Sequence, residues 1–246
     1  MKRRYKIGIG IIIIVILTLG WYLKPYKPMD SVEKVFEVED QIGVIDKEWL
    51  VFKPIDKEVD TGLIFYPGAK VKPKSYAPLA KEIAKSGYLV VIVPMPLNLA
   101  VLAVNSADEI INKELSIERW IMGGHSLGGA MAARYTYNNI NKISGLILLA
   151  SYPAENNDLS NKRVKVLSIY GDKDGITSMT KINKSKEFLP QNTQWVKIEG
   201  GNHSQFGCYG FQSGDKQASI SREKQQSLIL NSIRKFLLSF PVNKKH

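Results

Sequence analysis

Six short aliphatic runs, separated by segments with helical spacing, constrain the fold of this chain more than any other feature. The runs span residues 62–66, 88–93, 120–123, 145–150, 164–170 and 195–198. They are continuous rather than alternating, which is typical of strands buried on both faces of a parallel sheet. Between the first two runs, apolar residues recur at helical spacing, and Gly87 follows where that helix would end. The pattern predicts an α/β fold, with a mostly parallel central sheet covered by helices on both faces.

Two further segments precede these runs and alternate in part between apolar and polar residues. They span residues 31–40 and 43–53, and their alternation predicts a leading antiparallel hairpin. Near the other end, Ser221 is placed to cap a last helix whose apolar stripe ends before Pro241. Because no internal repeat is visible and the chain is long enough for one large core, we expect residues 31–246 to form a single domain.

The first thirty residues have a composition of their own. Residues 1–6 are strongly basic, and residues 7–23 form an uncharged, mostly aliphatic run. At about 1.5 Å per residue, a helix of this length nearly spans a hydrocarbon core of about 30 Å. The basic end is expected to stay in the cytoplasm. We therefore predict a single transmembrane helix in the cell membrane over residues 7–23, a short stalk over residues 24–30, and an extracytoplasmic domain after it.

A cleaved signal peptide is the alternative to a retained anchor. The run Thr18-Leu19-Gly20 loosely resembles a cleavage site, and cleavage there would release a secreted domain. Trp21 and Tyr22 follow directly and are typical of side chains at a membrane interface. They favour the retained helix.

The formal net charge of +11 raises the question of a nucleic-acid partner. Six of the 34 basic residues and none of the 23 acidic ones lie in residues 1–29, so the rest of the chain carries only a modest surplus. No nucleic-acid motif is present, and we expect no such partner. The single cysteine, Cys208, excludes an intramolecular disulfide and a CxxC motif. The sequence gives no indication of the oligomeric state.

A Gly-x-Ser-x-Gly pattern is centred on Ser126. It follows the aliphatic run at residues 120–123 and precedes a glycine- and alanine-rich helix start. This order of strand, sharp turn and helix is the one that a nucleophile elbow requires. A phosphate-binding loop would need G-x-G-x-x-G or Gly-Lys-Ser/Thr, and neither is present. Ser126 is therefore predicted to be a nucleophile, with a plain helix N-cap as the alternative.

A serine nucleophile needs a base, and the base needs an acid to orient it. Of the three histidines, His246 is terminal, and His125 is expected to point away from the nucleophile into the packing. His203 follows the last predicted strand and is the candidate base. Asp174 is preferred as the acid because it reaches further past the preceding strand than Asp172, which suits a turn.

The order Ser126, Asp174, His203 along the chain resembles the α/β-hydrolase superfamily, and the resemblance runs from about residue 62 to residue 240. Four motifs are similar to a small, cap-poor, membrane-anchored bacterial branch near carboxymethylenebutenolidase (dienelactone hydrolase) and simple carboxylesterases. They are Tyr66-Pro67-Gly68-Ala69, Gly-Gly-His-Ser-Leu-Gly-Gly-Ala, Ile169-Tyr170-Gly171-Asp172-Lys173-Asp174 and Glu199-Gly200-Gly201-Asn202-His203. Dienelactone hydrolase uses a cysteine nucleophile where this chain has a serine, so the resemblance supports the fold better than that substrate.

The resemblance implies a serine hydrolase of the carboxylesterase type. The amides of Leu127 and Ala69 would form the oxyanion hole, and the substrate would be a small-molecule or lipid ester. No metal and no cofactor are implied. An acyltransferase acting on envelope lipids or polymers, and a non-catalytic binding module on the same scaffold, are the alternative functions.

The surroundings of the predicted site are expected to be open. Only thirteen residues, 151–163, lie where many hydrolases of this fold insert a lid, too few for a domain-sized cap. The pocket walls are then expected to come from residues 94–97 and from the long loop 204–220, which carries Phe206, Tyr209 and Phe211. The alternative for that loop is an ordered cover over the sheet edge.

Overall fold

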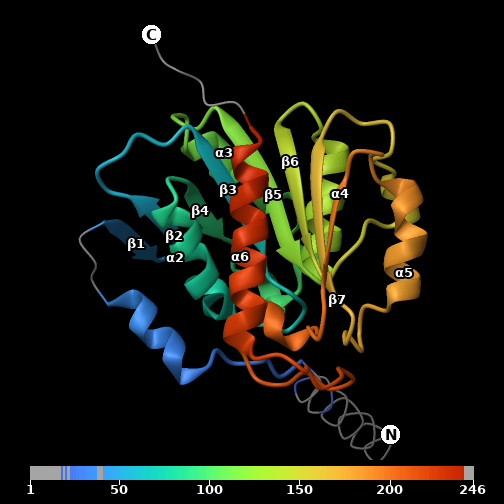
Figure 1. Cartoon of the computed structure of the whole chain (residues 1–246). Coiled ribbons are helices and arrows are strands. Elements are labelled where there is room, and N and C mark those ends of the chain that lie inside the picture. Colours follow the sequence, from blue (N-terminus) through green and yellow to red (C-terminus); the bar gives the residue numbers. More distant parts are fainter. Residues whose placement is uncertain (1–17, 19, 21–22, 38–40, 241–246) are drawn as a thin grey trace, which may run out of the picture.

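An eight-stranded sheet forms the centre of the domain, as the computed structural model shows (Figure 1). The structure describes residues 18, 20, 23–37 and 41–240. The strands are β1 (Ile42–Asp46), β2 (Leu50–Pro54), β3 (Thr61–Tyr66), β4 (Leu89–Ile92), β5 (Arg119–His125), β6 (Ile143–Leu149), β7 (Lys165–Gly171) and β8 (Gln194–Ile198). Their order across the sheet is β1-β2-β4-β3-β5-β6-β7-β8. Strands β3 to β8 are parallel, and β1 and β2 pair antiparallel at one edge. The predicted mostly parallel sheet is confirmed.

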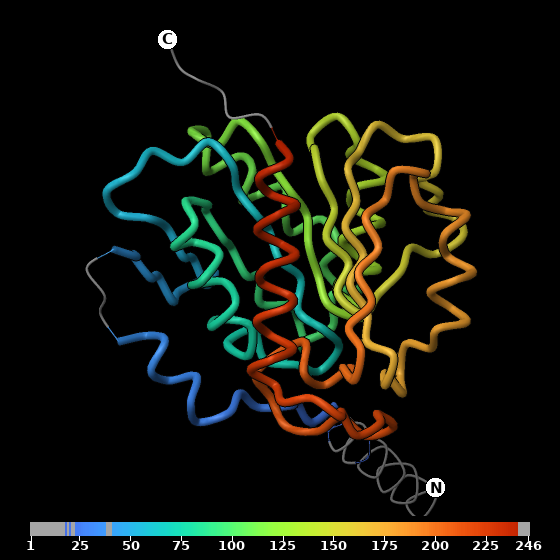
Figure 2. The backbone as a smooth tube through the Cα atoms, viewed as in Figure 1, coloured from blue at the N-terminus to red at the C-terminus, as the bar shows by residue number. Residues whose placement is uncertain are grey.

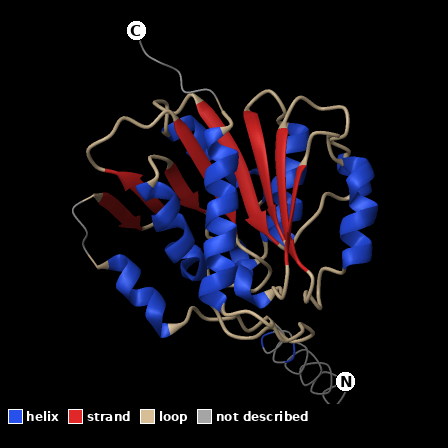
Figure 3. Cartoon of the chain, viewed as in Figure 1, coloured by secondary structure: helices blue, strands red, loops and turns tan. Residues whose placement is uncertain are grey.

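Helices cover both faces of the sheet (Figure 3). The α-helices are α2 (Ala77–Lys85), α3 (Ala107–Lys113), α4 (Leu127–Asn138), α5 (Met179–Lys184) and α6 (Arg222–Leu238). Short 3-10 helices are η1 (Asp30–Phe36), η2 (Pro73–Tyr76), η3 (Pro96–Asn98), η4 (Ala100–Leu102), η5 (Val104–Ser106), η6 (Glu155–Asn157), η7 (Ser185–Phe188) and η8 (Ser204–Phe206). Two predicted helix signals are confirmed, because Ser221 caps α6 and Gly87 has a φ of 98° just after α2.

The core is divided by the sheet into two layers. Residues of α2 and α6 pack on one face, and residues of α3 and α4 pack on the other. Side chains alternate between the layers along β3, where Leu63 and Phe65 face the α2 and α6 layer while Ile64 and Tyr66 face the other. Every residue of β3 is buried, which explains why its sequence from residue 62 to residue 66 is continuously apolar.

The leading hairpin begins later than predicted. Strands β1 and β2 form the hairpin. Asp30–Phe36 is the 3-10 helix η1, so the predicted strand over residues 31–40 was wrong for residues 31–37, the part of it that the structure describes. Val32, Val35 and Phe36 are spaced as neighbours on one side of a helix, and all three pack against the α2 and α6 layer. This helical spacing outweighs the partial alternation.

The segment before η1 follows the surface of the domain, although residues 24–30 were expected to be a stalk. The Tyr26 amide donates to Lys70 O at 2.7 Å, and the Lys72 amide donates back to Tyr26 O at 3.0 Å. Further on, the Met29 amide donates to Cys208 O at 3.0 Å. The tube in Figure 2 shows this segment running beside the loop that follows β8.

The predicted anchor over residues 7–23 lies outside the described residues, apart from Thr18, Gly20 and Leu23. Within the part of the chain that is described, no helix has the length and apolar character needed to cross a bilayer. The anchor therefore stays a prediction.

Candidate active site

Ser126 occupies a strained turn between β5 and α4. Its φ is 54° and its ψ is −124°, a backbone conformation that residues with a side chain rarely adopt. Glycines allow the tight packing around it: a Cβ on Gly124 would lie 2.5 Å from the carbonyl carbon of Gly128, and one on Gly128 would lie 2.1 Å from Tyr66 O. The turn leaves Ser126 half-buried at the carboxyl edge of the sheet, where its hydroxyl can be reached.

Asp174 and His203 form a buried pair on the loops that follow β7 and β8. Asp174 Oδ2 lies 2.8 Å from His203 Nδ1, and Asp174 Oδ1 accepts the amides of Ile176 and Thr177 at 2.8 and 2.6 Å. Because an ionised carboxylate only accepts hydrogen bonds, this network assigns the imidazole proton to Nδ1. Nε2 is thereby left with a free lone pair, the form that a general base needs.

Asp172, the alternative acid, connects two loops instead of contacting the imidazole of His203. Its Oδ1 accepts the amide of Gly200 at 2.7 Å, so it ties the loop after β7 to the loop after β8. Gly200 has a φ of 77°, which a glycine adopts without strain. The structure thus brings Asp174 to the imidazole of His203 and uses Asp172 in a turn.

Ser126 and His203 lie at the same sheet edge but are not hydrogen-bonded to each other. His203 is fully buried, and its Nε2 has no hydrogen-bond partner within the described residues. The ring of His125, directly before Ser126, lies 4.5 Å from the His203 ring, centroid to centroid. The candidate base therefore lies beside the turn of the nucleophile, and nucleophile–base contacts often tighten only when substrate is bound.

His125 belongs to a polar contact that the sequence did not reveal. The Gly68 amide donates to Tyr76 Oη at 3.0 Å, and Tyr76 Oη lies 2.8 Å from His125 Nδ1. The Tyr76 hydroxyl that accepts from Gly68 still has one proton, which it can donate to His125 Nδ1. Burial, together with the neighbouring His203, holds the pKa of His125 well below its ordinary value. His125 is therefore a neutral packing residue, as predicted.

The two amides predicted for an oxyanion hole lie on adjacent segments. Leu127 is the first residue of α4, and a Cβ on Gly128 would lie 2.3 Å from Pro67 O, so the loop carrying Ala69 runs against this helix start. The Gly68 amide is already hydrogen-bonded to Tyr76 Oη. The amides of Leu127 and Ala69 have no acceptor in the part of the chain that the structure describes.

A pocket of about 310 Å³ lies beside Ser126. Its lining comes from the loops after β5, β6 and β7 and consists mostly of small side chains: Ser126, Leu127, Ala130, Ala150, Ser151, Tyr152, Ala154, Ile176, Thr177 and Lys181. Neither residues 94–97 nor the loop 204–220 line this pocket, so the expected walls were wrong.

The loop 204–220 is an ordered cover instead. Phe206 and Tyr209 are fully buried, and the Phe206 ring stacks on His125 with centroids 5.7 Å apart. Of the three aromatic residues, only Phe211 is exposed. The two buried rings remove more apolar surface from water beneath the loop than they would at a pocket rim, which explains why the loop folds inward.

Asp215 holds this cover in place, and no sequence pattern marked it. Its Oδ2 accepts the amide and the hydroxyl of Ser204 at 2.8 and 2.6 Å, and its Oδ1 accepts the amides of Gly175 and His203 at 3.1 and 3.3 Å. Burial raises the pKa of Asp215, but these hydrogen bonds outweigh it and hold the pKa below the ordinary value. One carboxylate thus joins the cover to the loops of both Asp174 and His203.

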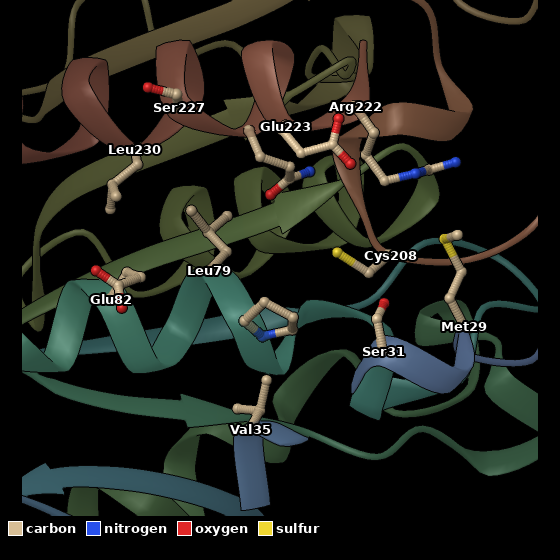
Figure 4. Close-up of a pocket in the computed structure, with 12 residues that line it drawn as sticks. Met29, Ser31, Val35, Leu79, Glu82, Cys208, Arg222, Glu223, Ser227 and Leu230 are labelled. Atoms are coloured by element: carbon tan, nitrogen blue, oxygen red, sulfur yellow. The ribbon is translucent and has the colours of Figure 1, made fainter. Parts of the chain in front are cut away.

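Cys208 lies in a different pocket, of about 440 Å³, between η1, α2 and α6 (Figure 4). Apolar side chains such as Leu79 and Leu230 face this space. Burial raises the pKa of the Cys208 thiol, which keeps it protonated and a poor nucleophile. The only cysteine is therefore no substitute for Ser126.

Comparison with known proteins relates this chain to one family and to several solved structures. The sequence profile of the alpha/beta hydrolase family matches residues 62–227. A predicted hydrolase from Thermoplasma acidophilum has a TM-score of 0.56 at 18% identity, covering 79% of this chain and 98% of its own. The esterase domain of a Rhodothermus marinus protein has a TM-score of 0.59 at 13% identity, with coverages of 79% and 98%. A serine hydrolase without a lid from Xanthomonas campestris has a TM-score of 0.55 at 16% identity, with coverages of 83% and 99%. No curated protein matches the chain.

Proposed function

This chain belongs to the alpha/beta hydrolase family, and we propose that it is a serine hydrolase that cleaves carboxylic esters through Ser126, His203 and Asp174. The observation that carries the proposal is the buried Asp174–His203 pair at the same sheet edge as the strained turn of Ser126. Such a pair orients an imidazole as a base and stabilises its cation. The structural similarity to an esterase domain and to a serine hydrolase without a lid supports this choice.

In the proposed mechanism, Ser126 Oγ attacks the ester carbonyl while His203 Nε2 takes its proton. The carbonyl π electrons move onto oxygen, and the amides of Leu127 and Ala69 stabilise the oxyanion. When the tetrahedral intermediate collapses, the bond to the alcohol oxygen breaks and His203 donates its proton to that oxygen. A water molecule then repeats the sequence on the acyl-enzyme, releasing the acid and free Ser126. Asp174 stays ionised throughout.

The location of the reaction is a second part of the proposal. We propose that residues 7–23 are retained as a transmembrane anchor and that the domain works outside the cytoplasm. The basic residues before this apolar run, and Trp21 and Tyr22 at its end, support this orientation. The substrate would then be a small-molecule or lipid ester available at the outer side of a membrane.

A comparison of two serines in the pocket tests the catalytic assignment. Ser126→Ala is expected to lower kcat for p-nitrophenyl acetate by roughly 10⁴-fold or more, because no other group would attack the carbonyl. Ser151 also lines the pocket, and its hydroxyl donates to Ser126 O at 2.7 Å. The control Ser151→Ala should keep most of the activity. Full activity of Ser126→Ala, with circular dichroism unchanged, would rule out Ser126 as the nucleophile.

A further inference from the structure

The segment that follows the predicted anchor lies on the carboxyl edge of the sheet. Tyr26 exchanges two backbone hydrogen bonds with the loop after β3, at Lys70 and Lys72. The Lys70 amide in turn donates to Asn98 O, in the loop after β4, at 2.8 Å. Pro28 pairs with Tyr209 in the loop after β8. Because β3, β4 and β8 are all parallel, these three loops lie at one edge of the domain, the edge that carries Ser126.

Large apolar side chains are exposed on the same edge. Leu97, Val101 and Leu102 follow β4 and are 61%, 48% and 55% exposed. Met29 and Phe211, on the segment and the loop that cross this edge, are also exposed. Leu97 and Asn98 adopt φ values of 52° and 56°, an unusual backbone for residues with side chains. This turn is held by backbone hydrogen bonds, with the Asn98 amide donating to Met95 O at 2.8 Å, and it leaves the Leu97 side chain in solvent.

Basic side chains accompany these apolar ones. Lys24, Lys27 and Lys72 are exposed on the segment and the loop that meet at Tyr26. Apolar side chains next to lysines are the combination that binds a membrane interface, where the first enter the acyl boundary and the second meet anionic headgroups.

We propose that this edge rests on the lipid bilayer that holds the predicted anchor, with Leu97, Val101 and Leu102 in the interfacial layer. The apolar run of residues 7–23 ends one residue before Lys24, so a retained anchor brings the membrane to this edge. The pocket at Ser126 then faces the bilayer, and its substrate is an ester that resides in the membrane. The docking rests on the proposed anchor, and the substrate class rests on the proposed function.

A fluorescence measurement on the full chain tests the docking without using catalysis. Cys208→Ser removes the native thiol, and Leu102→Cys or Leu115→Cys then carries an environment-sensitive NBD label. Leu115 is the matched control, because it is 84% exposed and precedes β5, at the opposite edge of the sheet. In vesicles of phosphatidylcholine and phosphatidylglycerol, nitroxide lipids should quench the label at position 102 at least about threefold more than at position 115. Equal quenching would overturn the docking, and a chain that does not float with the vesicles would overturn the anchor as well.

An activity measurement then tests the substrate class. Leu102→Asp should lower hydrolysis of a long-chain ester embedded in the vesicles by about tenfold or more, because an aspartate opposes seating in an anionic interface. Hydrolysis of soluble p-nitrophenyl acetate should not change, and Leu115→Asp should affect neither substrate. If Leu102→Asp lowers both rates equally or neither, the membrane-resident substrate is refuted. If the wild type hydrolyses neither ester, the proposed function itself fails.

Discussion

The two halves of the candidate site are built in opposite ways. On the side of β7 and β8, Asp174 and His203 are buried, and the carboxylates of Asp174 and Asp215 each accept several hydrogen bonds. On the side of β5 and β6, Ser126 is half-exposed and borders a pocket of small side chains. The difference separates two tasks. In the proposed mechanism, His203 is oriented before substrate arrives, which avoids reorganisation during the reaction, while Ser126 stays accessible for attack.

Among variants of the buried side and the residues that support it, the largest effect is expected at Asp174, the proposed partner of the base. Asp174→Asn should lower kcat by about 10⁴-fold, because an amide can hold His203 in the wrong tautomer. Asp172→Asn is the matched control two residues away, and it should cost less than about tenfold because the Asp172 carboxylate accepts the backbone amide of Gly200 rather than a group of the proposed triad. Steady-state kinetics on p-nitrophenyl acetate give both values. A larger loss for Asp172→Asn would reverse the assignment of the acid.

A smaller effect is expected at Tyr76, which joins the loop after β3 to His125. Tyr76→Phe leaves the Gly68 amide and His125 Nδ1 without their partner, which should cost about 1–3 kcal/mol of the free energy of unfolding. Because Gly68 precedes Ala69, kcat should also fall, by roughly tenfold, while KM changes little.

Tyr66→Phe is the control for this variant. Tyr66 Oη is also bonded to the backbone, at Val104 and Ala107, but on the α3 side of the sheet. It should cost similar stability, measured by urea unfolding, and leave kcat close to that of the wild type. Equal losses of kcat in the two variants would show that Tyr76 supports only the fold.

The smallest effect on activity is expected at Asp215, whose carboxylate ties the loop 204–220 to the loops that carry Asp174 and His203. Asp215→Asn should lower the free energy of unfolding by about 1–3 kcal/mol at pH 7, because the amide cannot accept all of the hydrogen bonds that the carboxylate accepts. The folded pKa of Asp215 lies below its unfolded value, so its stabilisation is present above the unfolded pKa and is lost as pH falls through the folded pKa. The stability gap between wild type and variant should therefore shrink in acid. A gap that does not depend on pH would contradict this role for its charge.

Features set by local sequence could be predicted, and those set by contacts between distant segments could not. The continuous aliphatic runs marked β3 to β8, and the glycines around Ser126 marked its turn. Asp215 and Tyr76 act through residues that are close only in the fold, so no spacing revealed them. The prediction that the loop 204–220 lines the pocket was wrong for the same reason. Its aromatic residues look like lining in the sequence, yet Phe206 packs on His125.

Covalent labelling tests the central claim most directly. A fluorophosphonate probe reacts with an activated serine, and peptide mass spectrometry then locates the adduct. We predict a single adduct on Ser126, absent from Ser126→Ala and formed far more slowly in Asp174→Asn, because the probe depends on the same base as the ester. An adduct on another serine, or an active esterase that the probe does not label, would contradict the assignment of Ser126 as the nucleophile.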